Sequence, residues 1–341
     1  MTLLHTFLDL LMPPAAIIGL IVTFPIVAIS KSVYWLFHLF SRENLRNKVV
    51  LITGASSGIG EHLAYKYAKR GARLVLSARR EEKLNAVAEL ARTKGAADTF
   101  VVTTDVTSED DCKSLIEQTI NRFGRLDHLV LNAGVANSFL LEDAKDTKSF
   151  TVIMDTLFWG SVYPAYFSLP YLRSSKGRIV VVASVASWLN YPRQTFYNAG
   201  KAALLQFFDT LRAEVRGSVG ITIATPGWVE SEMTQGKFVS GTGDSGAKPD
   251  GRDAHIGPTP VLTTEACAEA IVSGAERKKR YIVVPFWYLS FLPYRIWVPE
   301  AMEWLFQTFL LPRGRSPPLS KTLVDQLQMK TFYPAGLHKT E

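Results

Sequence analysis

A short apolar run that leads directly into a glycine-rich segment places the strongest constraint on the fold. Residues 49–53 are Val-Val-Leu-Ile-Thr, and Gly-Ala-Ser-Ser-Gly-Ile-Gly follows at once as residues 54–60. A helical segment, residues 61–70, and a second apolar run, residues 73–77, come next. This order predicts a strand, a tight turn, a helix and a parallel strand. Small residues in such a turn let backbone amides approach a pyrophosphate at the helix N-terminus.

Apolar runs and helical segments continue to alternate through residues 45–285. The alternation predicts an α/β fold: a doubly wound parallel sheet of the Rossmann type, forming a single domain. Glycine-containing or polar turns follow the carboxyl ends of the expected strands, which is the edge where ligands bind in such sheets. The later strands are expected at residues 99–104, 126–131, 179–182, 221–224 and 281–284.

Tyr197 and Lys201 lie four residues apart on a segment, residues 196–216, whose apolar positions recur at helical intervals. Side chains with this spacing are neighbours on one helix face, a spacing that solvated pairs also have. A free tyrosine titrates near ~10, and a lysine ammonium beside it favours the phenolate. Ser184 follows a predicted strand, where its hydroxyl can face a ligand. In this context the three side chains predict a site that protonates a carbonyl oxygen or deprotonates an alcohol.

The second predicted strand ends in Ala78-Arg79-Arg80, where an NAD enzyme of this layout places an acidic residue for the ribose diol. Arginine instead offers charge-assisted hydrogen bonds to phosphate. We therefore expect Arg79 or Arg80 to bind a 2′-phosphate, which indicates NADP(H) as the cofactor. The alternative is a pair of solvated arginines at the start of a surface helix.

Several motifs in the same order resemble those of the short-chain dehydrogenase/reductase family over residues 47–285. The resemblance implies that Tyr197 is the acid/base, that Lys201 binds the nicotinamide ribose and lowers the tyrosine pKa, and that Ser184 orients the reacting oxygen. The matching segments are Thr-Gly-Ala-Ser-Ser-Gly-Ile-Gly at residues 53–60, Asn132-Ala133-Gly134, Ser184, Tyr-Asn-Ala-Gly-Lys at residues 197–201, and Pro226-Gly227.

The expected cofactor site extends over the turns at the strand ends. Asp105 and Val106 stand where an adenine edge can be met, and the resemblance implies that Val229 and Ser231 hold the carboxamide. No metal is expected, because the two cysteines lack metal-ligand spacing. The predicted cofactor-binding residues are Gly54, Ser56, Ser57, Gly58, Ile59, Gly60, Arg79, Arg80, Asp105, Val106, Asn132, Ala133, Gly134, Tyr197, Lys201, Pro226, Gly227, Val229 and Ser231.

One position departs from the family pattern. Family members carry an asparagine in an Asn-x-x-Gly stretch, where it supports a water relay to the lysine, but this chain has Leu157-Phe-Trp-Gly160. Leucine neither donates nor accepts a hydrogen bond. The proton path then needs Thr156 or a rearranged water, and we expect slower turnover than the family norm.

The first 40 residues predict a hydrophobic anchor. Residues 10–30 contain no charged side chain and are long enough to cross a bilayer as a helix. Pro13, Pro14 and Pro25 are expected to break the helix, so that a hairpin in a lipid monolayer competes with a spanning anchor. Basic residues follow the segment, which favours a cytoplasmic catalytic domain on a lipid droplet or the ER membrane.

The anchor, the Ala-Arg-Arg turn and an aromatic extension at residues 286–341 resemble the plant oil-body hydroxysteroid dehydrogenases called steroleosins, whose plan the animal 11β-hydroxysteroid dehydrogenases share. The resemblance implies an NADP-dependent enzyme that interconverts a hydroxyl and a ketone at the 11β or 17β position of a sterol. A reductase of another apolar lipid, either 3-ketoacyl or retinoid, is the alternative within the enzyme class. Outside that class, the alternative is a non-catalytic nucleotide-binding protein of the droplet.

Partners follow from composition and from the last part of the chain. The formal net charge is +7, but the basic residues are dispersed, so a membrane surface is expected and nucleic acid is not. Aromatic residues after position 285 predict lipid contact, homodimer packing or an ordinary core edge. Residues 235–260 predict a substrate lid or a simple flexible loop, and residues 312–341 are expected to be irregular.

Overall fold

The computed structural model describes residues 3–39, 42–144, 147–235, 237–239, 245–247, 256–311, 316–334 and 337. Contacts divide the chain into two units, Met1–Glu43 and Asn44–Glu341. The first unit contains the helix α1. The sheet and every candidate site residue lie in the second unit.

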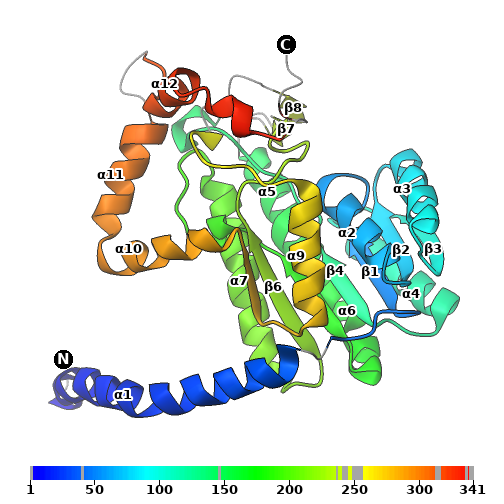
Figure 1. Cartoon of the computed structure of the whole chain (residues 1–341), viewed down its shortest axis with the longest axis horizontal. Coiled ribbons are helices and arrows are strands. Elements are labelled where there is room, and N and C mark those ends of the chain that lie inside the picture. The colour runs from blue at the N-terminus through cyan, green and yellow to red at the C-terminus, as the bar shows by residue number, and fades with distance from the viewer. Residues whose placement is uncertain are drawn as a thin grey trace. The chain divides into compact units, whose positions relative to one another are not determined.

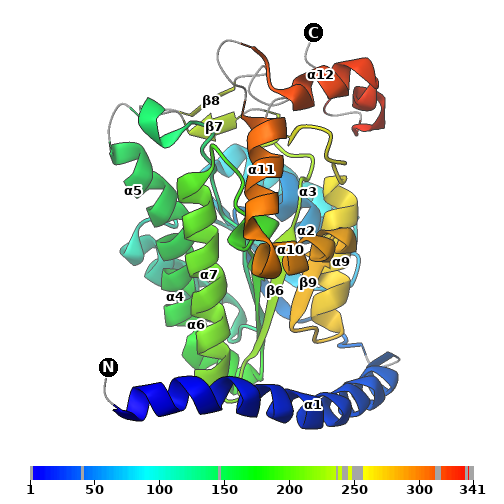
Figure 2. The same cartoon turned by 90° about the vertical axis from the view of Figure 1, so that its left-hand side faces the viewer.

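Helix α1, Leu3–Leu39, is continuous and contains Pro13, Pro14 and Pro25 in its interior. The expectation that these prolines divide the segment into short pieces is therefore wrong. Each proline removes one backbone donor, but the remaining hydrogen bonds of a long helix hold and the axis bends (Figure 2). Length and composition make Leu3–Val33 a candidate membrane span of 31 residues, none of it buried. At 1.5 Å per residue such a helix is about 46 Å long, more than the ~30 Å hydrocarbon core of a bilayer.

The second unit is built on a sheet of seven parallel strands in the order β3-β2-β1-β4-β5-β6-β9 (Figure 1), which confirms the predicted doubly wound fold. Strand order reverses between β1 and β4, and this switch point is where a ligand crevice opens in such sheets. The strands are β1 Val49–Thr53, β2 Arg73–Ala78, β3 Asp98–Thr103, β4 His128–Leu131, β5 Arg178–Val182, β6 Gly220–Pro226 and β9 Tyr281–Val284.

Helices cover both faces of the sheet, so the strands are apolar on both sides. Val50 and Ile52 of β1 pack in one core cluster, with residues of α2, α3 and α9. Val49 and Leu51 pack in the other, with residues of α4, α6 and α7. The bounds are α2 Gly58–Ala68, α3 Glu81–Thr93, α9 Thr264–Glu276, α4 Glu109–Phe123, α6 Gly160–Ser175 and α7 Thr195–Glu214.

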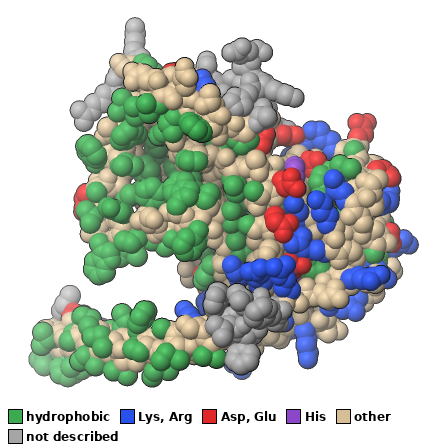
Figure 3. Space-filling model, in the orientation of Figure 1, with side chains coloured by type: hydrophobic (Ala, Val, Ile, Leu, Met, Phe, Trp, Pro, Cys, Tyr) green, Lys and Arg blue, Asp and Glu red, His purple; other side chains and the backbone are tan. Residues whose placement is uncertain are grey.

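The chain after β9 packs against the domain through Tyr288, which is fully buried. Tyr288 lies in η4 and clusters with Ala186 and Tyr191. A Cβ on Gly227 would stand 2.1 Å from its ring, so the glycine makes room for the aromatic side chain. The later elements expose aromatic residues such as Trp297. Figure 3 shows hydrophobic side chains gathered on the part of the surface where these elements lie. The elements are η4 Phe286–Ser290, α10 Phe291–Trp297, α11 Pro299–Leu310, α12 Leu319–Gln326 and η5 Met329–Phe332.

Two sequence expectations fall in the remaining segments. The irregular tail expected after residue 311 is wrong where the structure describes it, because α12 buries Ser320 and Val324 and is therefore held by packing. Most of the expected lid, residues 235–260, lies outside the described residues. Within it, β7 Lys237–Val239 and β8 Ser245–Ala247 form a two-stranded antiparallel sheet.

A buried carboxylate ties β1 to the start of β4. Asp127 is 1% exposed. It accepts hydrogen bonds from Lys48 Nζ at 3.0 Å, from the Val49 amide at 2.9 Å and from Arg125 Nη2 at 2.6 Å. Burial raises the pKa of Asp127, but the bonds from Arg125, Val49 and Lys48 outweigh it and hold the pKa below its ordinary value.

We expect Asp127→Asn to lower the free energy of unfolding by about 2–4 kcal/mol at pH 7, since two cations then face a neutral amide. Because the folded pKa lies below the unfolded value, this stabilisation is present above pH ~4 and is lost as the pH falls through the folded pKa. Urea unfolding in detergent at pH 7 and pH 3 measures both effects. A difference from wild type that does not shrink at pH 3 would contradict the assignment.

Asp325→Asn is the control, because its carboxylate is 52% exposed and pairs with Lys330 at 3.4 Å. An exposed pair of this kind contributes less than about 1 kcal/mol.

Candidate functional site

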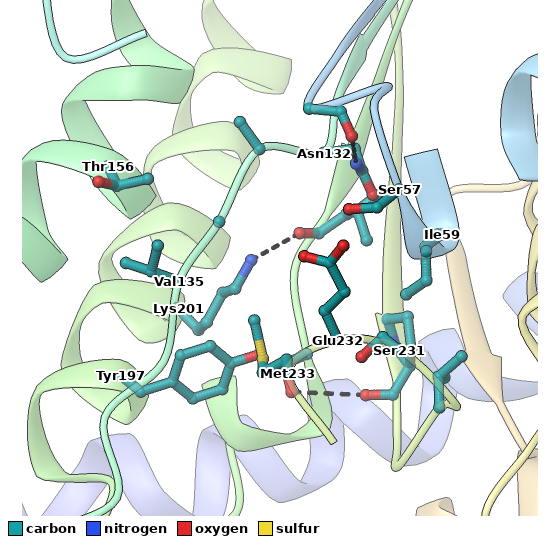
Figure 4. A pocket seen from close by; sticks show the side chains of 18 of the residues that line it. Ser57, Ile59, Asn132, Val135, Thr156, Tyr197, Lys201, Ser231, Glu232 and Met233 are labelled. Atoms are coloured by element: carbon teal, nitrogen blue, oxygen red, sulfur yellow. Dashed lines mark hydrogen bonds between the residues drawn. The ribbon is translucent and has the colours of Figure 1, made fainter. Parts of the chain in front are cut away.

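A cavity of about 390 Å³ opens at the carboxyl edge of the sheet (Figure 4). Its volume lies within the ~300–1,000 Å³ that is usual for ligand pockets. It is lined by Ser184, Tyr197 and Lys201 together with every predicted cofactor-binding residue except Gly60. The parallel topology therefore brings turns that are far apart in sequence to the carboxyl edge of the sheet, where ligands bind in folds of this kind.

Gly60 supports the site from behind the cavity wall. A Cβ at this position would stand 2.2 Å from the Gly54 carbonyl oxygen and 2.5 Å from Asn132 Nδ2. Both distances are too short for any side chain. Gly60 does not line the cavity, and its lack of a side chain lets α2 pack closely on the turn; that it contributes to cofactor binding stays a prediction.

Asn132 holds the glycine-rich turn in place. Its Nδ2 donates to the Thr53 and Gly54 carbonyl oxygens at 3.2 and 3.1 Å, and its backbone amide donates to Thr53 Oγ1 at 3.1 Å. Gly54 has φ +65°, and a Cβ there would stand 2.7 Å from Ala133 Cα. The turn after β1 is therefore clamped to the turn after β4 across the switch point.

The turn leaves the N-terminus of α2 open toward the cavity. The helix begins at Gly58, and the Ser57 side chain makes no capping hydrogen bond. First-turn amides of a helix carry a partial positive charge and are available to an anion. These residues fit the pyrophosphate of a dinucleotide.

Lys201 is the most buried cation of the cavity, with 4% of its surface exposed. Its Nζ donates to the Val182 carbonyl oxygen at 2.8 Å and lies 5.8 Å from the centre of the Tyr197 ring. Figure 4 shows the two side chains extending from α7 into the same cavity. Burial lowers the pKa of Lys201 to about 8, because a single carbonyl does not replace the water that an ammonium loses.

The pKa of Tyr197 moves in the opposite direction from the one expected. Burial raises it, and a hydrogen bond with Ser184 offsets only part of that increase. The ammonium of Lys201 is directed to the Val182 carbonyl and not to the phenol oxygen. Desolvation of the phenolate therefore dominates, and Tyr197 stays protonated at neutral pH.

Leu157 fills the position that the family gives to asparagine. It is fully buried in the π-helical turn η2, Asp155–Trp159, and packs with Tyr197. Thr156 lines the cavity, but its Oγ1 donates to the Val152 carbonyl oxygen at 2.8 Å. The hydroxyl of Thr156 thus retains only its acceptor capacity toward the cavity, and a proton relay through it stays a prediction.

The two arginines of the Ala-Arg-Arg turn differ in position. Arg80 donates from Nη2 to Ser56 Oγ at 3.1 Å and to Ser57 Oγ at 2.8 Å, and from Nη1 to the Glu232 carboxylate at 3.0 Å. Arg79 lies at the rim, with 72% of its side chain exposed, and its guanidinium is 4.0 Å from Asp105. Arg80 is therefore the guanidinium fixed against the glycine-rich turn.

Some cavity residues were missed by the sequence reasoning. Tyr191 and Gln194 lie between Ser184 and Tyr197, and Trp228 and Glu232 lie in or next to the Pro-Gly turn. Extending those two motifs by a few residues would have found them. Within the described residues, no group of three or more His, Cys, Asp or Glu side chains could hold a metal ion.

The arrangement has counterparts in known proteins. The family model described as short chain dehydrogenase matches residues 48–239. The chain therefore belongs to the short-chain dehydrogenase/reductase family of oxidoreductases. It is similar to the 11-beta-hydroxysteroid dehydrogenase of Pinus massoniana, at 49% identity over 91% of this chain and 87% of that protein. The 11-beta-hydroxysteroid dehydrogenase A of Sesamum indicum is 46% identical over 100% of this chain and 99% of its own length.

Solved structures share the fold. An alcohol dehydrogenase from Thermococcus sibiricus, complexed with 5-hydroxy-NADP, is 25% identical with a TM-score of 0.59, covering 70% of this chain and 95% of that one. A family member from Burkholderia phymatum in complex with NAD has a TM-score of 0.68 at 24% identity, covering 81% of this chain and 98% of that one. One carries an NADP derivative and the other NAD, so the neighbours leave the choice of cofactor open.

Proposed function

We propose that this protein is an NADP(H)-dependent dehydrogenase that interconverts a hydroxyl and a ketone on a sterol or hydroxysteroid. The observation that carries the proposal is the meeting of Ser184, Tyr197 and Lys201 in one cavity with Arg79 and Arg80. The names of the curated relatives support the steroid substrate. Apolar side chains of Val185, Tyr191 and Trp228 line the same cavity and suit an apolar ligand.

Ser184, Tyr197 and Lys201 have different roles in the proposed proton transfer. A bound nicotinamide supplies or accepts the hydride. Tyr197 holds the proton that the ketone oxygen takes up, and its raised pKa keeps that proton in place at neutral pH. Ser184 donates to the same oxygen and fixes its position. Lys201, on the next turn of the helix, would hold the cofactor ribose with its ammonium, which in this structure donates to the Val182 carbonyl oxygen.

Two alternatives share the cavity. A 3-ketoacyl or retinoid reductase would use the same three catalytic side chains with another apolar substrate. A non-catalytic nucleotide-binding protein would bind the cofactor and turn over nothing. Assaying the purified protein with NADPH and NADH against sterols, retinoids and ketoacyl thioesters separates the three. We expect turnover with a sterol or hydroxysteroid and NADP(H).

Tyr197→Phe removes the transferable proton and keeps the ring. We expect kcat/KM for the preferred substrate to fall by about 100-fold or more, with NADPH affinity nearly unchanged. Steady-state kinetics and a fluorescence titration with NADPH measure the two quantities. Tyr166→Phe is the matched control, because Tyr166 is 71% exposed on α6. Wild-type kcat in the Tyr197 variant would remove the acid/base assignment.

Replacing Arg79 and Arg80 together by Gln should weaken NADPH binding by about 10- to 100-fold, as for the loss of a hydrogen bond to a charged group. NADH binding should change little, since NADH lacks the 2′-phosphate. Calorimetric titration with both cofactors tests this. Arg92→Gln, at an exposed i,i+3 pair with Glu89, is the control. Equal losses for the two cofactors would mean that the arginines serve the turn and not the phosphate.

We propose that α1 anchors the protein to the ER membrane or a lipid droplet with the catalytic domain in the cytoplasm, and that the apolar substrate, the lipid surface and a second copy of the chain are its partners. The candidate span Leu3–Val33 and the basic residues after it support the anchor. Exposed Trp297 and Trp304 of α10 and α11 support a lipid or dimer contact.

Deleting residues 1–43 should move the protein from the membrane and droplet fractions to the supernatant with its NADPH affinity retained. The deletion ends at the boundary between the two units. Flotation and immunoblotting measure the distribution, and protease protection of an N-terminal tag on the full chain distinguishes a spanning helix from one that stays on the cytoplasmic side. A truncated protein that still floats would place the attachment elsewhere.

A further inference from the structure

The carboxylate of Glu232 pairs with Arg80, one of the two arginines that we assign to the 2′-phosphate. Glu232 accepts from Arg80 Nη1 at 3.1 and 3.0 Å, and from Lys83 Nζ at 2.9 Å. Its side chain is 32% exposed, and Figure 4 shows it extending into the cavity near Ser57. Two cations, Arg80 at the N-cap of α3 and Lys83 in its first turn, thus converge on one anion supplied from the turn after β6.

The contacts of Arg80 leave little room for a second anion. Its Nε and Nη2 donate to Ser56 Oγ, and Nη2 also donates to Ser57 Oγ. The remaining nitrogen, Nη1, donates to both carboxylate oxygens of Glu232. A phosphate that uses the guanidinium must therefore replace the carboxylate, because two anions at this distance repel each other and compete for the same donors.

Glu232 belongs to a turn that is closed by hydrogen bonds among its neighbours. The Ser231 amide donates to Thr234 Oγ1 at 2.8 Å, and Thr234 Oγ1 donates to the Val229 carbonyl oxygen at 2.8 Å. The amide of Gln235 donates to the Ser231 carbonyl oxygen at 3.0 Å. Glu232 is thus presented to Arg80 by a hydrogen-bonded turn.

We propose that Glu232 is an internal competitor for the 2′-phosphate and sets the affinity for NADP(H). It holds Arg80 and Lys83 until a phosphate takes its place, and it stays in place when the ligand has only a ribose hydroxyl. This inference rests on the proposed NADP(H) preference. Its consequence is that the loss of the Glu232 charge tightens the binding of phosphate-bearing ligands alone.

The probes are 2′,5′-ADP, which carries the 2′-phosphate, and 5′-AMP, which lacks it. Calorimetric titration of the full chain in detergent gives the dissociation constant of each. We expect Glu232→Gln to tighten 2′,5′-ADP by about fivefold and to leave 5′-AMP unchanged. Glu230→Gln, two residues earlier in the same turn and outside the hydrogen-bond partners of Arg80, should change neither.

A double-mutant cycle ties the effect to the arginine. In an Arg80→Gln background, Glu232→Gln should give a smaller gain for 2′,5′-ADP, because the guanidinium is gone and Lys83 is the one remaining cation that Glu232 pairs with. A thermal melt of each variant checks folding. Weaker 2′,5′-ADP binding in Glu232→Gln, or an equal gain for both probes, would overturn the proposal.

The same titrations separate this inference from the proposed function. If wild type binds the two probes equally but Glu232→Gln prefers 2′,5′-ADP, then the competitor is real and the proposed NADP(H) preference is wrong. If wild type prefers 2′,5′-ADP and the variant shows no gain, the NADP(H) preference holds and Glu232 has no part in it. Equal binding of both probes by both proteins would reject the two together.

Discussion

The close packing of the turn after β1 on the turn after β4 is the constraint on which the whole site depends. Neither Gly54 nor Gly60 has room for a side chain, and Asn132 clamps the two turns with its amide group. This packing fixes where α2 begins, and hence where its free amides point. The same two turns form part of the cavity lining.

The cations that line the cavity are of two kinds. Lys201 is buried and has one carbonyl partner, and burial lowers its pKa to about 8, so its charge depends on pH above neutrality. Arg80 keeps its charge at every physiological pH, and Glu232 balances it. Binding of the cofactor's phosphates is therefore expected to be less sensitive to pH than the proton transfer is.

Local pattern was enough to predict much of the site, and burial and long-range pairing explain the rest. Tyr197 and Lys201 share one helix, so their spacing alone made them neighbours, and parallel strands bring every carboxyl-end turn to one edge. The pairing of Arg80 with Glu232 joins residues 152 positions apart, which no local pattern reveals. The raised pKa of Tyr197 arises from burial, a property of the folded domain. The prediction that prolines break α1 was wrong, because a long helix bends at a proline and keeps its other backbone hydrogen bonds.

The contact between Tyr288 and Gly227 connects the site to the order in which the chain is synthesised. Residues 3–39 leave the ribosome before the strands of the sheet, whereas Tyr288 and the helices after it leave later than β9. The wall of the cavity near Tyr191 is complete only when this late segment has packed. A nascent chain therefore exposes the apolar α1 before the wall of its cavity near Tyr191 is complete.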